Sequence, residues 1–163
     1  MIFEKDLIND NYKIRFSQDT TEDGRLVSQS LIVDSLKNKR DTISYNFYRP
    51  AEFKKGLTLY HVTFKDKLEG ILKDGLVPTC GYGYKNHWLS FFWDDEITEK
   101  LYPGVFLKAG EPINGFGFNE DYPCFAVNID DLDPDYLFID DSIDDSYIYT
   151  KTIRPDQFLH LTL

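Results

Sequence analysis

The sequence predicts an α+β domain, and three observations support this fold class. Short stretches in which apolar and polar residues alternate recur along most of the chain, which is typical of strands. Aromatic residues make up 16% of the sequence, a high fraction that suits a β-rich protein. Helical spacing of apolar residues is confined to short segments near residues 70 and 97. With 163 residues, the chain is long enough to form one domain with a substantial core.

The first third of the chain predicts a β-hairpin and a further strand. Residues 12–17 and part of 25–33 alternate between apolar and polar side chains, and the polar segment between them ends in Asp-Gly, a frequent hairpin turn. Residues 42–48 form an aromatic, strand-like run. We interpret residues 1–56 as a β-rich N-terminal extension packed on the core, where the hairpin covers one sheet edge.

The central stretch, residues 57–92, predicts a strand, a helix, a loop and a second strand. The apolar run 57–62 has the length of a buried strand. Leucine and isoleucine then recur at spacings of three and four, which predicts a helix with Asp66 as its N-cap. Gly75 follows where a helix favours a residue of left-handed conformation. Residues 87–92 form the second strand-like run.

The remaining chain adds one short helix and several strands. Residues 94–101 predict the helix, with Asp94 as a candidate N-cap. Glycine and proline dominate residues 102–122, which predicts mostly loop. The later strands are predicted at residues 105–107, 123–129, 136–139, 147–153 and 158–163.

Charge and cysteine content restrict the functional class. A net charge of -10 argues against a general nucleic-acid coat, because phosphate binding depends on lysine and arginine. Cys80 and Cys124 form neither a metal pattern nor a disulfide framework, which favours a reduced, intracellular setting. No apolar run approaches the roughly 18 residues of a membrane span, and the first residues lack the form of a signal peptide. We therefore expect a cytoplasmic protein with no membrane partner and no metal.

Five short motifs resemble the ADP-ribosyltransferase family, in the branch whose first motif is His-x-Thr. This branch includes the DarT-like DNA-modifying toxins and, more distantly, the RNA 2'-phosphotransferases. The motifs occur in the family's order between residues 57 and 163. They are Leu-Tyr-His-Val-Thr at 59–63, Ile-Leu-Lys-Asp-Gly-Leu-Val-Pro at 71–78, His-Trp-Leu-Ser at 87–90, Phe-Ala-Val-Asn-Ile-Asp at 125–130 and Ile-Arg-Pro-Asp-Gln-Phe at 153–158.

The resemblance implies a fold, a substrate and a reaction. The fold would be a split pair of antiparallel β-sheets with short helices, formed by an ADP-ribosyltransferase-like core at residues 57–163, with residues 1–56 outside it. The cleft would bind NAD as substrate. The reaction would transfer ADP-ribose to a macromolecular acceptor, a protein or a nucleic acid, whose identity the sequence does not reveal.

The resemblance also implies roles for individual residues. His61 would hydrogen-bond a ribose hydroxyl of NAD, with Tyr60 and Thr63 beside it in the pocket. Ser90 would lie near the nicotinamide ribose. An aromatic ring would stack on the nicotinamide, supplied by Tyr82, Tyr84 or the pair Phe91 and Phe92. Holding the sugar in this way suits a reaction that builds oxocarbenium character at the ribose.

The catalytic glutamate of many family members has no counterpart near residues 146–147. Asp144 and Asp145 stand just before this position and either could supply a carboxylate in its place, with Asp145 as the residue we assign. The alternative is that residues 140–145 are a solvated acidic loop. Three other functions remain open: a non-catalytic module that binds a nucleotide or partner, an NAD glycohydrolase, and an RNA 2'-phosphotransferase. An RNA 2'-phosphotransferase needs basic residues in the cleft, and Lys85 and Lys100 are the only basic residues between Lys73 and Lys108.

Overall fold

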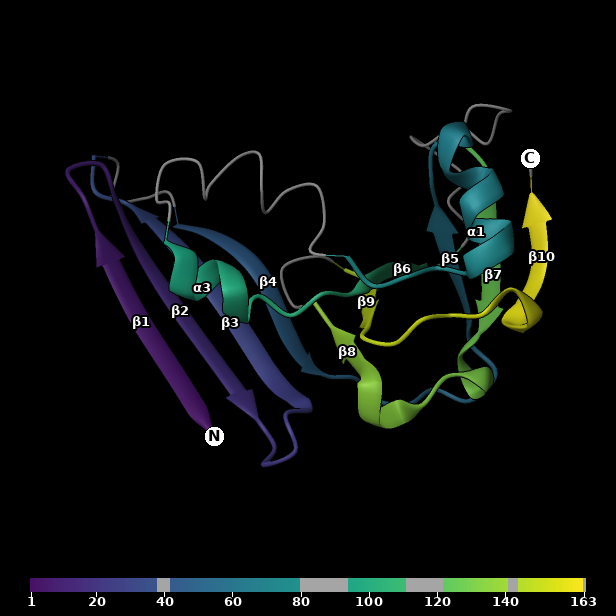
Figure 1. The fold of residues 1–163 in the computed structure, drawn as a ribbon, viewed down its shortest axis with the longest axis horizontal. Coiled ribbons are helices and arrows are strands. Elements are labelled where there is room, and N and C mark those ends of the chain that lie inside the picture. The colour runs from purple at the N-terminus through teal and green to yellow at the C-terminus, as the bar shows by residue number, and fades with distance from the viewer. Residues whose placement is uncertain (38–41, 80–93, 111–121, 141–143, 163) are drawn as a thin grey trace. The chain divides into compact units, whose positions relative to one another are not determined.

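The computed structural model describes residues 1–37, 42–79, 94–110, 122–140 and 144–162. The helices and strands within these ranges follow one another along the chain as shown in Figure 1. They are β1 (Ile2–Ile8), β2 (Tyr12–Thr20), β3 (Leu26–Ser35), β4 (Thr42–Pro50), β5 (Thr58–Val62), α1 (Leu68–Asp74), α3 (Asp95–Lys100), β6 (Val105–Ala109), β7 (Cys124–Asn128), β8 (Leu137–Ile139), β9 (Ser146–Tyr149) and β10 (Phe158–Thr162).

The predicted α+β fold with split antiparallel sheets is wrong. The described strands belong to one ten-stranded sheet in the order β1-β2-β3-β4-β8-β9-β6-β5-β7-β10. The pairings resolved residue by residue are all antiparallel. The described helices, α1 and α3, have only 7 and 6 residues.

Several local predictions are confirmed, and others are corrected. The hairpin exists as β2 and β3, but it belongs to a run of four consecutive antiparallel strands rather than forming an extension alone. The Asp94 side chain caps α3 by accepting from the Ile97 backbone N–H at 3.0 Å. Gly75 ends α1 with a φ of 85°. Asp66 is not a cap, because a 3₁₀ turn over Lys65–Lys67 precedes α1.

By backbone proximity the chain divides into two compact units. The first unit comprises Met1–Pro50, Cys80–Pro103 and Ile139–Asp144. The second unit comprises Ala51–Thr79, Gly104–Phe138 and Asp145–Leu163. The predicted separation of residues 1–56 from 57–163 as domains stays a prediction.

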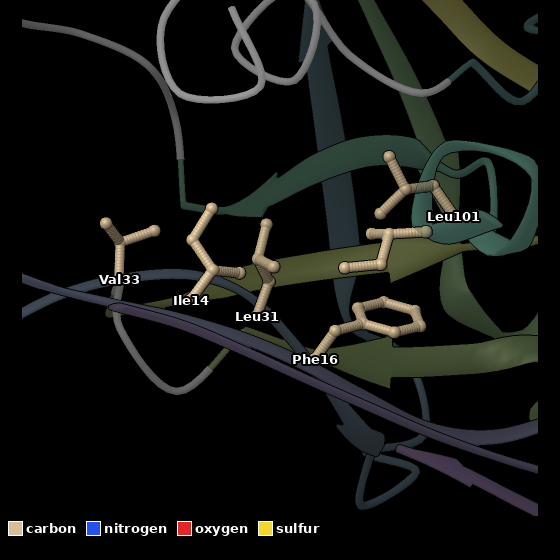
Figure 2. Close-up of a cluster of buried hydrophobic side chains, with 6 residues drawn as sticks. Ile14, Phe16, Leu31, Val33 and Leu101 are labelled. Atoms are coloured by element: carbon tan, nitrogen blue, oxygen red, sulfur yellow. The ribbon is translucent and has the colours of Figure 1, made fainter. Parts of the chain in front are cut away.

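The core of the first unit lies between one face of β2 and β3 and the helix α3. Alternation along the strands places Ile14 opposite Val33 and Phe16 opposite Leu31. Figure 2 shows these four side chains on the same side of the strands, with Leu101 facing them. Ile97 of α3 completes this buried cluster. The pairing explains the alternation that the sequence shows, since each strand buries every second side chain.

A buried glutamine pair continues this core. Gln18 and Gln29 are cross-strand neighbours, and the Gln18 side-chain amide donates to the Gln29 side-chain oxygen at 2.9 Å. The same Gln18 amide donates to the Lys100 carbonyl, and Gln29 accepts from the Tyr102 backbone N–H at 3.0 Å. These hydrogen bonds attach the C-terminal end of α3 to the strands beneath it.

The second unit is built on short strands that are buried along most of their length. The side chains of Leu59, Phe125, Val127 and Ile148 are fully buried. Beyond α1, Leu76 and Ile153 form an isolated antiparallel bridge with two backbone hydrogen bonds of 2.9 Å. This bridge holds the chain that leaves α1 against the segment that follows β9. In the strand order, β5 lies between β6 and β7.

Candidate functional site

Strand β5 carries the predicted histidine, and its two neighbours pair with it over different lengths. The pairing with β7 runs from Thr58 opposite Asn128 to Val62 opposite Cys124. The pairing with β6 covers only Leu59 opposite Ala109 and Tyr60 opposite Lys108. Strands β5 and β6 therefore stop pairing one residue before His61.

The imidazole of His61 lies where β5 and β6 stop pairing. Its Nδ1 is 2.7 Å from the backbone carbonyl oxygen of Phe106 in β6. A carbonyl oxygen only accepts hydrogen bonds, so Nδ1 carries the proton of the neutral ring and donates it. At this point the hydrogen bond between the two strands comes from the imidazole ring and not from the backbone. The same bond fixes which ring nitrogen carries the proton.

Burial lowers the pKa of His61 below its usual value, and the hydrogen bond to the Phe106 carbonyl opposes this effect only in part. Desolvation has this direction because it disfavours the charged imidazolium. The ring is therefore neutral at neutral pH, with the lone pair of Nε2 as an acceptor. A group in this state accepts a hydrogen bond from a hydroxyl group, and it does not act as a fixed positive charge.

The residues predicted beside His61 are divided between the two faces of the sheet. Because successive side chains of a strand point to opposite faces, Tyr60 lies on the face opposite to His61. Thr63 returns to the His61 face. Its backbone N–H donates to the Pro123 carbonyl at 3.0 Å and continues the β5–β7 register. The structure brings His61 and Thr63 together and separates Tyr60 from them.

Asp145, the predicted carboxylate, lies two strands away from His61. Its carbonyl oxygen accepts from the Ala109 backbone N–H at 2.9 Å, and Ala109 in turn pairs with Leu59 of β5. Two strand spacings amount to about 10 Å, so Asp145 is too distant to hydrogen-bond His61 directly. It is exposed and has a φ of 58°, a left-handed conformation uncommon for aspartate.

The acidic loop is not uniformly solvated, because Asp140 is a buried residue.

The remaining predicted site residues lie outside the part of the chain that the structure describes. They are Ser90, Tyr82, Tyr84, Phe91 and Phe92.

The sequence reasoning missed an aromatic pair at the end of β5. The rings of Phe64 and Tyr122 are 5.7 Å apart between centroids and tilted by 51°. Both residues are exposed, Phe64 by 61% and Tyr122 by 37%, although aromatic rings of this size usually bury most of their surface. The sequence contains one indication of this pair, because Phe64 directly follows the His-x-Thr motif.

The described ranges contain no group of three or more histidine, cysteine and acidic side chains arranged to hold a metal ion. They also contain no helix of the length and apolar character needed to cross a membrane. Cys124 is buried, and this burial raises the pKa of its thiol to about 11, so the thiol is unsuited to nucleophilic attack.

Comparison of the chain with protein-family models, curated proteins and solved structures found no match. The resemblance to ADP-ribosyltransferases therefore stays a prediction that depends on the short motifs.

Proposed function

We propose that the chain binds NAD at the end of β5 and transfers its ADP-ribose to a macromolecular acceptor. The observation that carries this proposal is the neutral imidazole of His61, held by the Phe106 carbonyl where β5 and β6 stop pairing. Its Nε2 lone pair is the acceptor that a ribose hydroxyl requires. We place this activity in the cytoplasm.

Each described residue near the strand end has a role in this proposal. His61 accepts a hydrogen bond from a ribose hydroxyl and fixes the sugar, which matters because bond cleavage develops positive charge at the ribose. The exposed rings of Phe64 and Tyr122 offer planar apolar surface to a base of the dinucleotide. Asp145 supplies the carboxylate that orients the ribose or activates the acceptor. The backbone of Asp145 is at least about 10 Å from His61, a distance that one dinucleotide bound across these strands would have to span.

The test compares two substitutions of His61 that separate its structural role from ligand binding. In His61→Asn, the side-chain N–H still reaches the Phe106 carbonyl, but the Nε2 acceptor is lost. In His61→Ala both are lost. We expect His61→Asn to keep its stability and to bind NAD about tenfold more weakly in calorimetry, as the loss of one hydrogen bond implies. NAD binding by the wild type that His61→Asn leaves unchanged would contradict the proposal.

Transfer is tested by incubating the protein with labelled NAD and a cell lysate. Label should appear on a macromolecule with the wild type and disappear with His61→Asn. Asp145→Asn should abolish the transfer and leave NAD binding intact. Release of nicotinamide without a labelled macromolecule would instead identify an NAD glycohydrolase.

The second candidate function is a non-catalytic module that binds a nucleotide. The observation in its favour is the position of Asp145, which is exposed and two strands from His61. NAD binding that depends on Nε2 of His61, without nicotinamide release and without any labelled product, would support this candidate over transfer.

A further inference from the structure

Strand β1 forms one end of the strand order and hydrogen-bonds only to β2 among the described strands. Its seven residues pair with β2 without a register shift, from Ile2 opposite Asp19 to Ile8 opposite Lys13. It contains neither a proline nor a bulge, two common devices that protect sheet edges from other strands. The edge of β1 that faces away from β2 can therefore pair with another strand in a regular register.

The hydrogen bonds at both ends of β1 show which backbone groups face this open edge. The Met1 amino group and carbonyl both bond to Thr20, and the Asn9 N–H donates to the Tyr12 carbonyl. In an antiparallel ladder every second residue bonds to the same neighbour. The odd-numbered residues of β1 thus bond to β2. The even-numbered residues direct their N–H and C=O groups to the open edge: Ile2, Glu4, Asp6 and Ile8.

The side chains of these same residues form a symmetric pattern of apolar, acidic, acidic and apolar. Ile2 is 73% exposed and Ile8 70%, among the most exposed large apolar side chains in the described ranges. Glu4 and Asp6 are exposed between them. Because the pattern reads the same in both directions, it fits a partner strand that runs either way.

On the other face of β1, the charge of Lys5 is already neutralised. Its ammonium group lies 2.8 Å from Asp94 and 2.9 Å from Glu96, on the side of α3. The flanking residues on this face, Phe3 and Leu7, are packed partly against the core cluster. On the exposed face, Asp6 lies 3.8 Å from the ammonium group of Lys13 in β2. Glu4 forms no ion pair among the described residues, so the charge at the edge that is left without an ion pair is acidic.

A second copy of this chain is a poor partner for the edge. If two copies of β1 pair antiparallel with Lys5 at the centre, Glu4 of each copy lies opposite Asp6 of the other. If Glu4 or Asp6 is at the centre instead, that acidic residue lies opposite the same residue of the other copy. Like charges directly opposite each other destabilise a strand pair. The net charge of -10 on each chain adds to this repulsion.

We propose that β1 is a docking edge for an extended segment of a partner protein, which adds a strand to the first unit. The segment carries basic residues opposite Glu4 and Asp6 and apolar residues opposite Ile2 and Ile8. Backbone hydrogen bonds to the even-numbered residues supply affinity, and the side-chain pattern supplies specificity, as in other cases of strand addition.

The test uses a fluorescent peptide, Ile-Val-Lys-Glu-Lys-Val-Ile with glycine-serine flanks, and fluorescence anisotropy. The matched control peptide, Ile-Val-Glu-Lys-Glu-Val-Ile, has the charges reversed. The full chain should bind the first peptide at least tenfold more tightly than the second, since opposite-charge pairs replace like-charge pairs. The double substitution Glu4→Lys and Asp6→Lys should invert this preference.

Comparing Glu4→Pro with Glu4→Ala separates strand addition from simple attraction between charges, since both remove the carboxylate and only proline removes an N–H from the open edge. Proline leaves the β1–β2 ladder intact, so the fold should persist by circular dichroism. Glu4→Pro should bind the peptide at least tenfold more weakly than Glu4→Ala. Equal binding to Glu4→Pro and Glu4→Ala, an unchanged preference after charge reversal, or no wild-type binding at the solubility limit of the peptide would each overturn the proposal. A dimer in sedimentation that Glu4→Pro abolishes would overturn it as well, because a second copy would then occupy the edge.

Discussion

The two units differ in how the order of strands in the sheet relates to their order in the chain. In the first unit, β1 to β4 pair in chain order, each with the strand that follows it. In the second unit the order is β9-β6-β5-β7-β10, so several neighbours are distant in sequence. Pairing of distant segments requires closure of longer loops, which costs more chain entropy. The first unit can therefore set its registers locally, whereas the second depends on packing between distant segments.

The units also differ in how they accommodate polar side chains that are buried or partly buried. In the first unit, Gln18 and Gln29 pair with each other and with the backbone at the end of α3. In the second unit, His61 is neutral and bonds to one carbonyl where two strands stop pairing. The glutamine pair has its hydrogen bonds supplied from within the unit. The histidine has a second ring nitrogen, Nε2, beyond the one that bonds to Phe106. We propose that this atom accepts a hydrogen bond from a ligand, and we therefore assign binding to the second unit.

The largest expected effect tests the dependence of the second unit on contacts between distant segments. A Cβ atom at Gly75 would lie 2.2 Å from the Ile153 carbonyl oxygen, and Gly75 has a φ of 85°. Gly75→Ala should therefore lower the free energy of unfolding by about 4 kcal/mol, by strain and by displacement of the Leu76–Ile153 bridge. Urea denaturation followed by circular dichroism measures this change.

Gly56→Ala is the matched control for this substitution. Gly56 has a similar φ of 80°, but no atom lies within 4 Å of a Cβ placed there. Its cost should be about 1 kcal/mol, from backbone strain alone. Equal losses for the two variants would show that the close approach to Ile153 adds nothing to the stability of the second unit.

The next effect concerns the buried polar pair of the first unit. Gln29→Leu leaves the Tyr102 N–H without this acceptor and removes a partner of the Gln18 amide. We expect a loss of about 2 kcal/mol in the free energy of unfolding, the usual cost of unsatisfied buried groups. Hydrogen exchange should also become faster in α3.

Ser30→Ala, at the neighbouring position on the opposite face of β3, should change stability by less than about 0.5 kcal/mol and leave exchange in α3 unaltered. If Gln29→Leu gives the same result as this control, the glutamine pair does not attach α3 to the strands.

Local features of the fold were predictable from the sequence. Asp94 caps α3 and Gly75 ends α1, because both roles depend on residues within one helical turn. Strands β2 and β3 were predictable because their buried side chains alternate regularly. Each of these features is decided by neighbours in the chain.

Strand β1 was missed for a physical reason. Its side chains do not follow an apolar face and a polar face, since Lys5 points toward α3 while Ile2 and Ile8 are exposed. The charge of Lys5 is neutralised by Asp94 and Glu96, which lie about 90 residues further along the chain. No local pattern reveals such a partner.

The continuous strand order was missed for a similar reason, because it depends on pairings between distant segments. The candidate site was predictable only in part. The motif pointed to His61, but its bond to Phe106 and the early end of the β5–β6 pairing require the register of distant strands. The predicted contact of Asp145 with the same ligand stays a prediction.

A smaller effect is expected at the start of α3. Asp94→Ala removes the side chain that accepts from the Ile97 N–H and also one partner of Lys5. We expect the free energy of unfolding to fall by about 1 kcal/mol, the usual cost of losing an N-cap. Urea denaturation at neutral pH measures it, with Asp95→Ala as the control because Asp95 lies in the same turn without being the cap. A loss of stability for Asp95→Ala equal to that for Asp94→Ala would contradict the assignment of the cap.

The smallest effect is a pH dependence that tests how the second unit holds His61. Burial lowers the pKa of His61 in the folded chain below 6.5, its usual value, so the unfolded chain binds a proton more readily. The contribution of the neutral ring is therefore complete above the unfolded pKa. It is lost as the pH falls through the window between about 6.5 and the lower folded pKa.

Comparing the wild type with His61→Asn isolates this contribution, since the other two histidines and all carboxylates are present in both proteins. The wild type should lose more stability than His61→Asn between about pH 7.5 and about pH 5.5, measured by urea denaturation. If both proteins lose the same stability, the imidazole is not held neutral. Its Nε2 would then be protonated at mildly acidic pH and would repel rather than accept the hydrogen of a ribose hydroxyl, so NAD binding should also be followed over this range.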